Sequence, residues 1–189
     1  MIKATYIDDW RLISKLSAEW PFTQEEIYLA LEQEEFIGEE RAYCTIPKSI
    51  ILQQLLNKME EAIPKLLTEL CEQEQFKKDL WHLESTEQMT NNVRTTCSFA
   101  RDTPGFDTNI HLDSRMTVCT GMLFFNQDND PLQSTCFYTT LTGNEPVCMS
   151  SQFGNGWFAA NTSISWHTGG NASSRYRYSL IFNVYLNLL

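Results

Sequence analysis

Residues 109–126 read NIHLDSRMTVCTGMLFFN, two β-prone runs separated by a short polar turn. The second run, residues 117–125, is rich in β-branched and aromatic residues, which favour strands. Similar short runs recur through the second half of the chain, and turn residues such as Pro104-Gly105 separate them. Many short strands with turn signals at this spacing predict a β-sandwich or a barrel.

The expected strands all lie after residue 90. They cover residues 93–99, 109–113, 117–125, 134–140, 156–160, 163–167 and 176–186.

The first 90 residues show helical periodicity instead. Thr23 and Glu26 form a capping-box pattern at the start of one helix, which we expect to end near Gly38. A second apolar repeat begins at Ser49, and Pro64 is expected in the first turn of a further helix. We expect these helices to pack on one face of the sheet. Helices first and strands afterwards indicate the α+β fold class.

Composition and charge limit the functional classes. The length of 189 residues fits one domain with its own core. The net charge is −10 and no basic stripe is present, so a nucleic-acid partner is not expected. No apolar run is long enough to span a bilayer, and no membrane partner is expected. The first residues lack the apolar core of a signal peptide, which predicts a cytoplasmic protein.

Six cysteines are scattered along the chain without a Cys-x-x-Cys pair. Because we expect a cytoplasmic location, and because paired spacing is absent, the sequence predicts that all six are reduced thiols. They are Cys44, Cys71, Cys97, Cys119, Cys136 and Cys148.

The residues with the clearest chemical meaning are His111, Asp113 and His167. Residues i and i+2 of a strand point to the same face, so His111 and Asp113 can bind one metal ion from a single strand. His167, from a distant strand, would complete a set of two histidines and one carboxylate. Such a set leaves three adjacent coordination positions open, as Fe(II) oxygen chemistry requires.

Several segments resemble, in this order along the chain, the 2-oxoglutarate- and Fe(II)-dependent dioxygenases, especially small bacterial and phage members of the prolyl-4-hydroxylase-like branch. The segments are residues 102–106, 111–113, 120–126, 134–138, 166–167 and 177–182. The resemblance implies a double-stranded β-helix, also called a jelly roll or cupin-like fold, with N-terminal helices packed on the major sheet. It implies one oxygenase domain over residues 1–189. In that domain, residues 1–90 form a mainly helical support and residues 91–189 form the jelly-roll catalytic core.

The resemblance also assigns roles in the site. It makes His111, Asp113 and His167 the catalytic metal ligands for Fe(II). It makes 2-oxoglutarate a co-substrate whose C5 carboxylate is bound by Arg177, since a guanidinium offers a planar pair of donors. Ser179 lies on the same strand face and would donate a further hydrogen bond. Arg175 shares that face and is the competitor, expected nearer the mouth of the site.

The reaction that the resemblance implies is hydroxylation of a C–H bond by O2, with conversion of 2-oxoglutarate to succinate and CO2. Ascorbate is a candidate reductant. The substrate would be an amino acid, a peptidyl side chain or another small molecule, and its identity stays open. Candidate pocket residues are Asn109, Arg115, Asn126, Tyr138, Trp157 and Asn161.

Two alternatives remain at this point. One is a cupin-like metalloenzyme that uses the same ligands without 2-oxoglutarate. The other is a non-catalytic jelly-roll binding module. Arg177 and Ser179 argue against both, because neither alternative needs a buried cation for a dicarboxylate.

Overall fold

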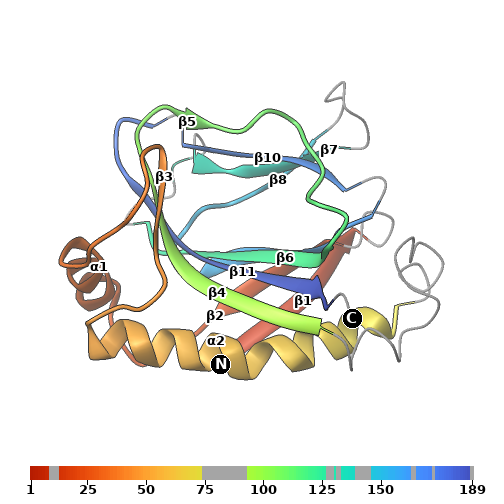
Figure 1. Cartoon of the computed structure of the whole chain (residues 1–189), viewed down its shortest axis with the longest axis horizontal. Coiled ribbons are helices and arrows are strands. Elements are labelled where there is room, and N and C mark those ends of the chain that lie inside the picture. The colour runs from red at the N-terminus through yellow and green to blue at the C-terminus, as the bar shows by residue number, and fades with distance from the viewer. Residues whose placement is uncertain are drawn as a thin grey trace.

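The computed structural model describes residues 1–8, 13–73, 93–126, 130, 133–138, 146–162, 165–171 and 173–187. Within these ranges the chain forms two helices and two antiparallel sheets, which lie one above the other (Figure 1). Helix α2 runs along one face of the larger sheet, and the smaller sheet lies on the opposite side (Figure 1). The expected α+β double-stranded β-helix is confirmed.

The described part of the larger sheet has seven strands. Their order is β1 (Ile2–Asp8), β2 (Ile13–Ala18), β9 (Asn155–Ala160), β6 (Thr117–Phe124), β11 (Arg177–Leu186), β4 (Val93–Asp102) and β3 (Arg41–Cys44). The described part of the smaller sheet has four strands. Their order is β5 (Phe106–Asp107), β10 (Trp166–Asn171), β7 (Thr135–Tyr138) and β8 (Val147–Met149).

The two helices begin where the sequence predicted. Helix α1 (Gln24–Glu32) begins with a capping box, in which Thr23 Oγ1 accepts from the backbone of Glu26 and the Glu26 carboxylate accepts from the backbone of Thr23. Helix α2 (Ile50–Cys71) follows Ser49.

The expectation of a new helix at Pro64 is wrong, because α2 continues through this residue. A proline inside a helix removes one backbone hydrogen bond. The apolar stripe of α2 nevertheless continues on both sides of Pro64, with Ile63 and Leu67 buried against the sheet. Burial of this stripe offsets the cost of the lost bond.

The helical description of residues 1–90 is incomplete, because this part also contributes β1, β2 and β3. Strand β2 pairs with β9, and β3 pairs with β4, so the front of the chain forms both edges of the larger sheet. Strands β2 and β3 pair with partners that are distant in sequence, whereas β1 pairs with the adjacent β2. The predicted strand 109–113 is also wrong, since only His111 makes an isolated bridge there.

Alternation along β11 separates two cores. Leu180, Phe182 and Val184 pack in the cluster that includes the helices. Ile181 packs in a second cluster between the two sheets, together with Trp157 of β9. The odd-numbered residues of β11 therefore face the space between the sheets, where the candidate site lies.

The prediction of six free thiols is wrong for two cysteines. Cys136 and Cys148 form a disulfide between β7 and β8, whereas the other four cysteines are free. Cys136 and Cys148 are directly opposed partners in the ladder of these strands. Their separation of 12 residues matches no local motif, so the pairing follows only from strand register.

Among the described residues, no helix combines the length and the apolar character needed to cross a membrane.

Candidate metal centre and its cavity

His111, Asp113 and His167 converge as predicted. Their potential ligand atoms all lie within 4.8 Å of one another. Asp113 Oδ1 lies 4.0 Å from His111 Nε2 and 3.8 Å from His167 Nε2. Two imidazoles and one carboxylate at this spacing form a donor set that suits a divalent iron ion.

The two histidines meet across an isolated bridge between the segment after β5 and the start of β10. Each donates its backbone N–H to the carbonyl of the other, at 3.0 Å and 2.9 Å. The ring centroids are 4.5 Å apart. Asp113 lies two residues beyond His111, outside any strand, so its convergence depends on local contacts of the following turn.

Backbone carbonyls orient both imidazoles. Nδ1 of His111 lies 2.8 Å from the carbonyl oxygen of Asn109, and Nδ1 of His167 lies 3.0 Å from that of Ser165. Each contact favours the tautomer with the proton on Nδ1 and leaves Nε2 as the lone-pair donor. Both Nε2 atoms face Asp113, so the rings are set for metal binding.

Thr120 of β6 holds the carboxylate of Asp113, and Asn161, just after β9, holds the backbone of the turn that follows it. Thr120 Oγ1 donates to Asp113 Oδ2 at 2.6 Å, which leaves Oδ1 for the metal. Asn161 Nδ2 donates to the carbonyls of Ser114 and Thr117 at 2.8 Å and 2.9 Å. Asn161, a candidate pocket residue in the sequence, therefore holds the turn that carries Asp113.

Burial lowers the pKa of His167, and the nearby Asp113 carboxylate partly opposes this shift. A lowered pKa keeps the imidazole neutral at neutral pH. The neutral form is the one that binds a metal ion.

A cavity of about 310 Å³ adjoins the three residues. Its wall also includes Trp157, as the sequence suggested, and Thr120. Other residues of the wall include Arg41, Tyr43, Thr108, Thr135, Gly169, Ile181, Asn183 and Tyr185.

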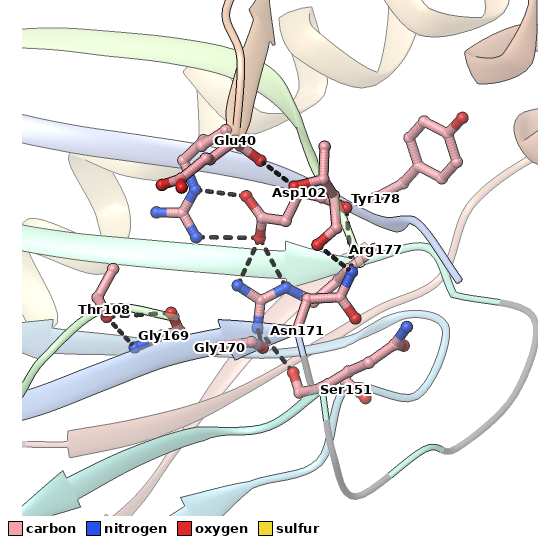
Figure 2. A network of polar contacts seen from close by, with 12 residues as sticks. Glu40, Asp102, Thr108, Ser151, Gly169, Gly170, Asn171, Arg177 and Tyr178 are labelled. Atoms are coloured by element: carbon pink, nitrogen blue, oxygen red, sulfur yellow. Dashed lines mark hydrogen bonds and ion pairs between the residues drawn. The ribbon is translucent and has the colours of Figure 1, made fainter. Parts of the chain in front are cut away.

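Arg177 does not line this cavity. The side chain is fully buried, and it donates to Asp102 through Nε at 2.8 Å and through Nη2 at 2.5 Å (Figure 2). Nη1 donates to the carbonyls of Gln133 and Gly170. Ser179 is also fully buried, and its hydroxyl has no hydrogen-bond partner in the part of the chain that the structure describes.

Arg175 is exposed and lies outside the cavity wall, so its expected position near the mouth is wrong. Burial raises the pKa of Tyr28 in α1, on the helix side of the sheet, and the positive charge of Arg175 opposes this rise. Asn109, Arg115, Asn126 and Tyr138 do not line the cavity either.

Sequence reasoning missed Arg41, which belongs to β3 and lines the cavity. Its guanidinium bonds to Asp102, the same carboxylate that binds Arg177. No local motif marks Arg41, because its place follows from the pairing of β3 with β4.

No protein-family model matches the chain, and no curated protein matches it. Solved structures do match. A prolyl-4-hydroxylase from Pseudomonas putida has a TM-score of 0.60 at 14% identity, over 94% of this chain and 94% of that chain. A viral collagen prolyl hydroxylase from Paramecium Bursaria Chlorella virus-1, in complex with 2-oxoglutarate, has a TM-score of 0.61 at 12% identity, over 95% and 98%.

A third match is a prolyl hydroxylase from Trichoplax adhaerens, in complex with a peptide fragment of hypoxia inducible factor. Its TM-score is 0.63 at 12% identity, over 93% of this chain and 84% of that chain. These structures show that the chain has the fold of the 2-oxoglutarate- and Fe(II)-dependent oxygenases, with a His-Asp-His triad in it.

Proposed function

We propose that this protein is a 2-oxoglutarate- and Fe(II)-dependent dioxygenase that hydroxylates a C–H bond and releases succinate and CO2. The observation that carries the proposal is the orientation of the triad. Both imidazoles direct Nε2 toward one carboxylate oxygen of Asp113, at the wall of a cavity of about 310 Å³. Both Nδ1 atoms and the second carboxylate oxygen are bonded elsewhere, which leaves the three atoms that face one another for a metal ion.

His111, Asp113 and His167 would hold the Fe(II) ion. Three protein ligands leave positions open for 2-oxoglutarate and for O2. The bound iron supplies the activation of O2, coupled to decarboxylation of the co-substrate. The protein orients the ligands through Thr120 and through the backbone of Asn109 and Ser165, and the cavity walls limit access of water.

The distal carboxylate of 2-oxoglutarate requires a cationic end of the cavity. The sequence predicted Arg177 and Ser179 for this role, but neither lines the cavity, whereas Arg41, which shares the Asp102 carboxylate with Arg177, does. Thr135 belongs to the same wall. The hydroxyls of Thr135 and Ser179 are both buried without a hydrogen-bond partner in the described ranges. Buried hydroxyls without a partner are costly, and the Thr135 hydroxyl in the cavity wall is therefore available to a ligand oxygen.

The substrate would be an amino acid, a peptidyl side chain or a small metabolite. The Trichoplax relative is bound to a peptide, which makes a peptidyl side chain one reasonable class to test first. Ascorbate would be tested as the reductant.

Anaerobic titration of the purified protein with Fe(II) and then 2-oxoglutarate tests the proposal. We expect a weak visible charge-transfer band that requires both components, and His167→Ala should lack it. Binding of the metal without any effect of 2-oxoglutarate would favour a cupin-like metalloenzyme instead. Binding of neither would favour a non-catalytic jelly-roll module.

A further inference from the structure

Arg41, Asp102 and Arg177 form a row across three neighbouring strands, which we call the arginine ladder. Arg41 of β3 is the ladder partner of Asp102 in β4, and Asp102 is the partner of Arg177 in β11. Directly opposed residues of antiparallel strands project from the same face of the sheet. The Asp102 carboxylate therefore accepts from both guanidiniums, at 2.5 Å and 3.0 Å from Arg41 and at 2.8 Å and 2.5 Å from Arg177.

The ladder carries two positive charges and one negative charge. Asp102 and Arg177 have side chains that are 0% exposed, and the Arg41 side chain is 19% exposed. A further carboxylate that acts on Arg177 is that of Asp107, which is exposed. Excess charge at a buried position is costly unless an opposite charge approaches it. An anion is the ligand that would offset this cost.

Only one arginine of the ladder faces the cavity. Arg41 lines the cavity wall beside Tyr43, whose hydroxyl interacts with it. Arg177 lies behind the wall, where Nε and Nη2 bind Asp102 and Nη1 binds two carbonyls. A ligand in the cavity thus meets Arg41 first.

Gly169, which lines the cavity, places no side chain between the cavity and the two guanidiniums. A Cβ atom at this residue would lie 3.7 Å from Arg41 Nη2 and 3.8 Å from Arg177 Nη2. Thr135 is directly opposite Gly169 in the pairing of β7 with β10. Its buried hydroxyl has no hydrogen-bond partner among the described residues, and Thr135 belongs to the cavity wall. Arg41 and the Thr135 hydroxyl therefore both face the cavity, and a cation with a hydroxyl donor suits a carboxylate.

The distance from the metal site suits a short dicarboxylate. Gly169 lies two residues after His167 on β10, and both line the cavity. A step of two residues along a strand is about 6.6 Å. An extended five-carbon chain spans about 5 Å between its terminal carbons. A dicarboxylate of this length can therefore place one carboxylate at the metal and the other beside Gly169, the residue that Arg41 Nη2 adjoins.

We propose that Arg41 makes the direct contact with the distal carboxylate of a dicarboxylate co-substrate, together with the Thr135 hydroxyl. Arg177 then acts through Asp102 as a positioning residue that holds Arg41 in place. This inference rests on the proposed function, because it takes 2-oxoglutarate as the ligand.

The test compares two oxo acids on the Mn(II)-loaded protein by isothermal titration calorimetry, without turnover. 2-Oxoglutarate has the distal carboxylate, and 2-oxopentanoate has the same carbon chain without it. Arg41→Gln should weaken binding of 2-oxoglutarate by about 10- to 100-fold, as expected for loss of a charged hydrogen bond. Binding of 2-oxopentanoate should change little, and Arg41→Lys should recover part of the affinity.

Arg101→Gln is the matched control. Arg101 precedes Asp102 on β4, but its guanidinium lies over the ring of Phe36 on the helix side. This variant removes the same charge from the opposite face, so the preference for 2-oxoglutarate should stay as in the wild type.

Gly169→Ala provides a second, independent variant in case Arg41→Gln does not fold. Its Cβ meets only ordinary contacts, yet it fills the space before Arg41. It should also reduce the preference for 2-oxoglutarate. If the wild type binds both oxo acids and both variants keep the full preference, the role of Arg41 is wrong while the proposed function stands. If the wild type binds neither acid, the proposed function is wrong and the inference with it.

Discussion

The hydroxyl of Thr120 donates a 2.6 Å hydrogen bond to Oδ2 of Asp113, and this contact turns Oδ1 toward the two histidines. Asn183 lies 2.9 Å from the same hydroxyl. Outer contacts of this kind fix the geometry of a metal ligand and raise its affinity. Thr120 thus connects the sheet to the metal site.

Replacing Thr120 should weaken metal binding without removing it. Thr120→Val keeps the shape of the side chain but loses the donor, so we expect about a 10- to 100-fold loss of Mn(II) affinity. Thr120→Ser keeps the donor and should bind nearly as well as the wild type. Calorimetric titration of the metal-free protein measures both. Equal affinities for Val and Ser would show that the hydrogen bond does not matter.

Removing any residue of the triad should abolish tight Fe(II) binding. His111→Ala, Asp113→Ala and His167→Ala each delete one of three ligands, and the remaining two hold a metal ion poorly. Circular dichroism should still show a folded protein, and anaerobic Fe(II) titration measures the loss. His82→Ala, which changes the one histidine outside the triad, is the control, and this variant should bind Fe(II) normally. A triad variant with full affinity would not be a ligand.

Arg177 should contribute strongly to stability as well as to the site. Arg177→Ala leaves the buried carboxylate of Asp102 with Arg41 as its remaining cation partner in the ladder. Removing one partner of a buried ion pair costs about 3 to 5 kcal/mol. We expect a loss of about 3 kcal/mol in the free energy of unfolding, measured in urea. Exposed Arg175→Ala is the comparison and should change stability little.

The disulfide between Cys136 and Cys148 should be detectable chemically. After unfolding without reductant, four of the six cysteines should react with a thiol reagent, and all six should react after reduction. Mass spectrometry of the labelled chain distinguishes the two results. Six reactive thiols before reduction would contradict the disulfide.

The same disulfide closes a loop with a sequence separation of 12 residues. Loss of a crosslink over a loop of this size costs about 2 to 3 kcal/mol, chiefly through the entropy of the unfolded chain. The double variant Cys136→Ser with Cys148→Ser should show this loss in urea unfolding. Cys97→Ser, which removes a free and partly buried cysteine, serves as the comparison.

The sequence predicted the parts of the molecule that leave a local signature. The capping box at Thr23 and the apolar stripe of α2 are patterns within one segment. The triad was recognisable because His111 and Asp113 are two residues apart and His167 follows in the expected order. Their convergence did not need a regular strand, since a single bridge and the hydrogen bond from Thr120 bring them together.

Three features that sequence reasoning missed depend on strand register. Arg41 reaches the cavity because β3 pairs with β4, and Cys136 meets Cys148 because β7 pairs with β8. Likewise, the partner of Arg177 is Asp102, which lies 75 residues earlier in the chain. Pairing between distant strands is set by the whole sheet, so neither spacing nor periodicity of one segment can indicate these contacts.

The stability of the metal-free protein should fall in mild acid because of His167. Burial lowers the pKa of this imidazole below its ordinary value of 6.5. Below pH 6.5 the unfolded chain therefore binds a proton that the folded protein resists, and the free energy of unfolding decreases from that pH down to the folded pKa. Above pH 6.5 the imidazole is neutral in both the folded and the unfolded chain. His167 then no longer changes the free energy of unfolding with pH.

Urea unfolding of the metal-free protein between pH 5 and pH 8 measures this dependence (the range brackets the usual histidine pKa of about 6.5). His167→Gln keeps a polar side chain without the titration, so its stability should change less with pH over the acid half of the range. Bound Mn(II) should oppose the loss, since the metal competes with the proton for Nε2 and favours the folded state. Equal pH slopes for the wild type and His167→Gln would show that the buried imidazole does not control acid stability.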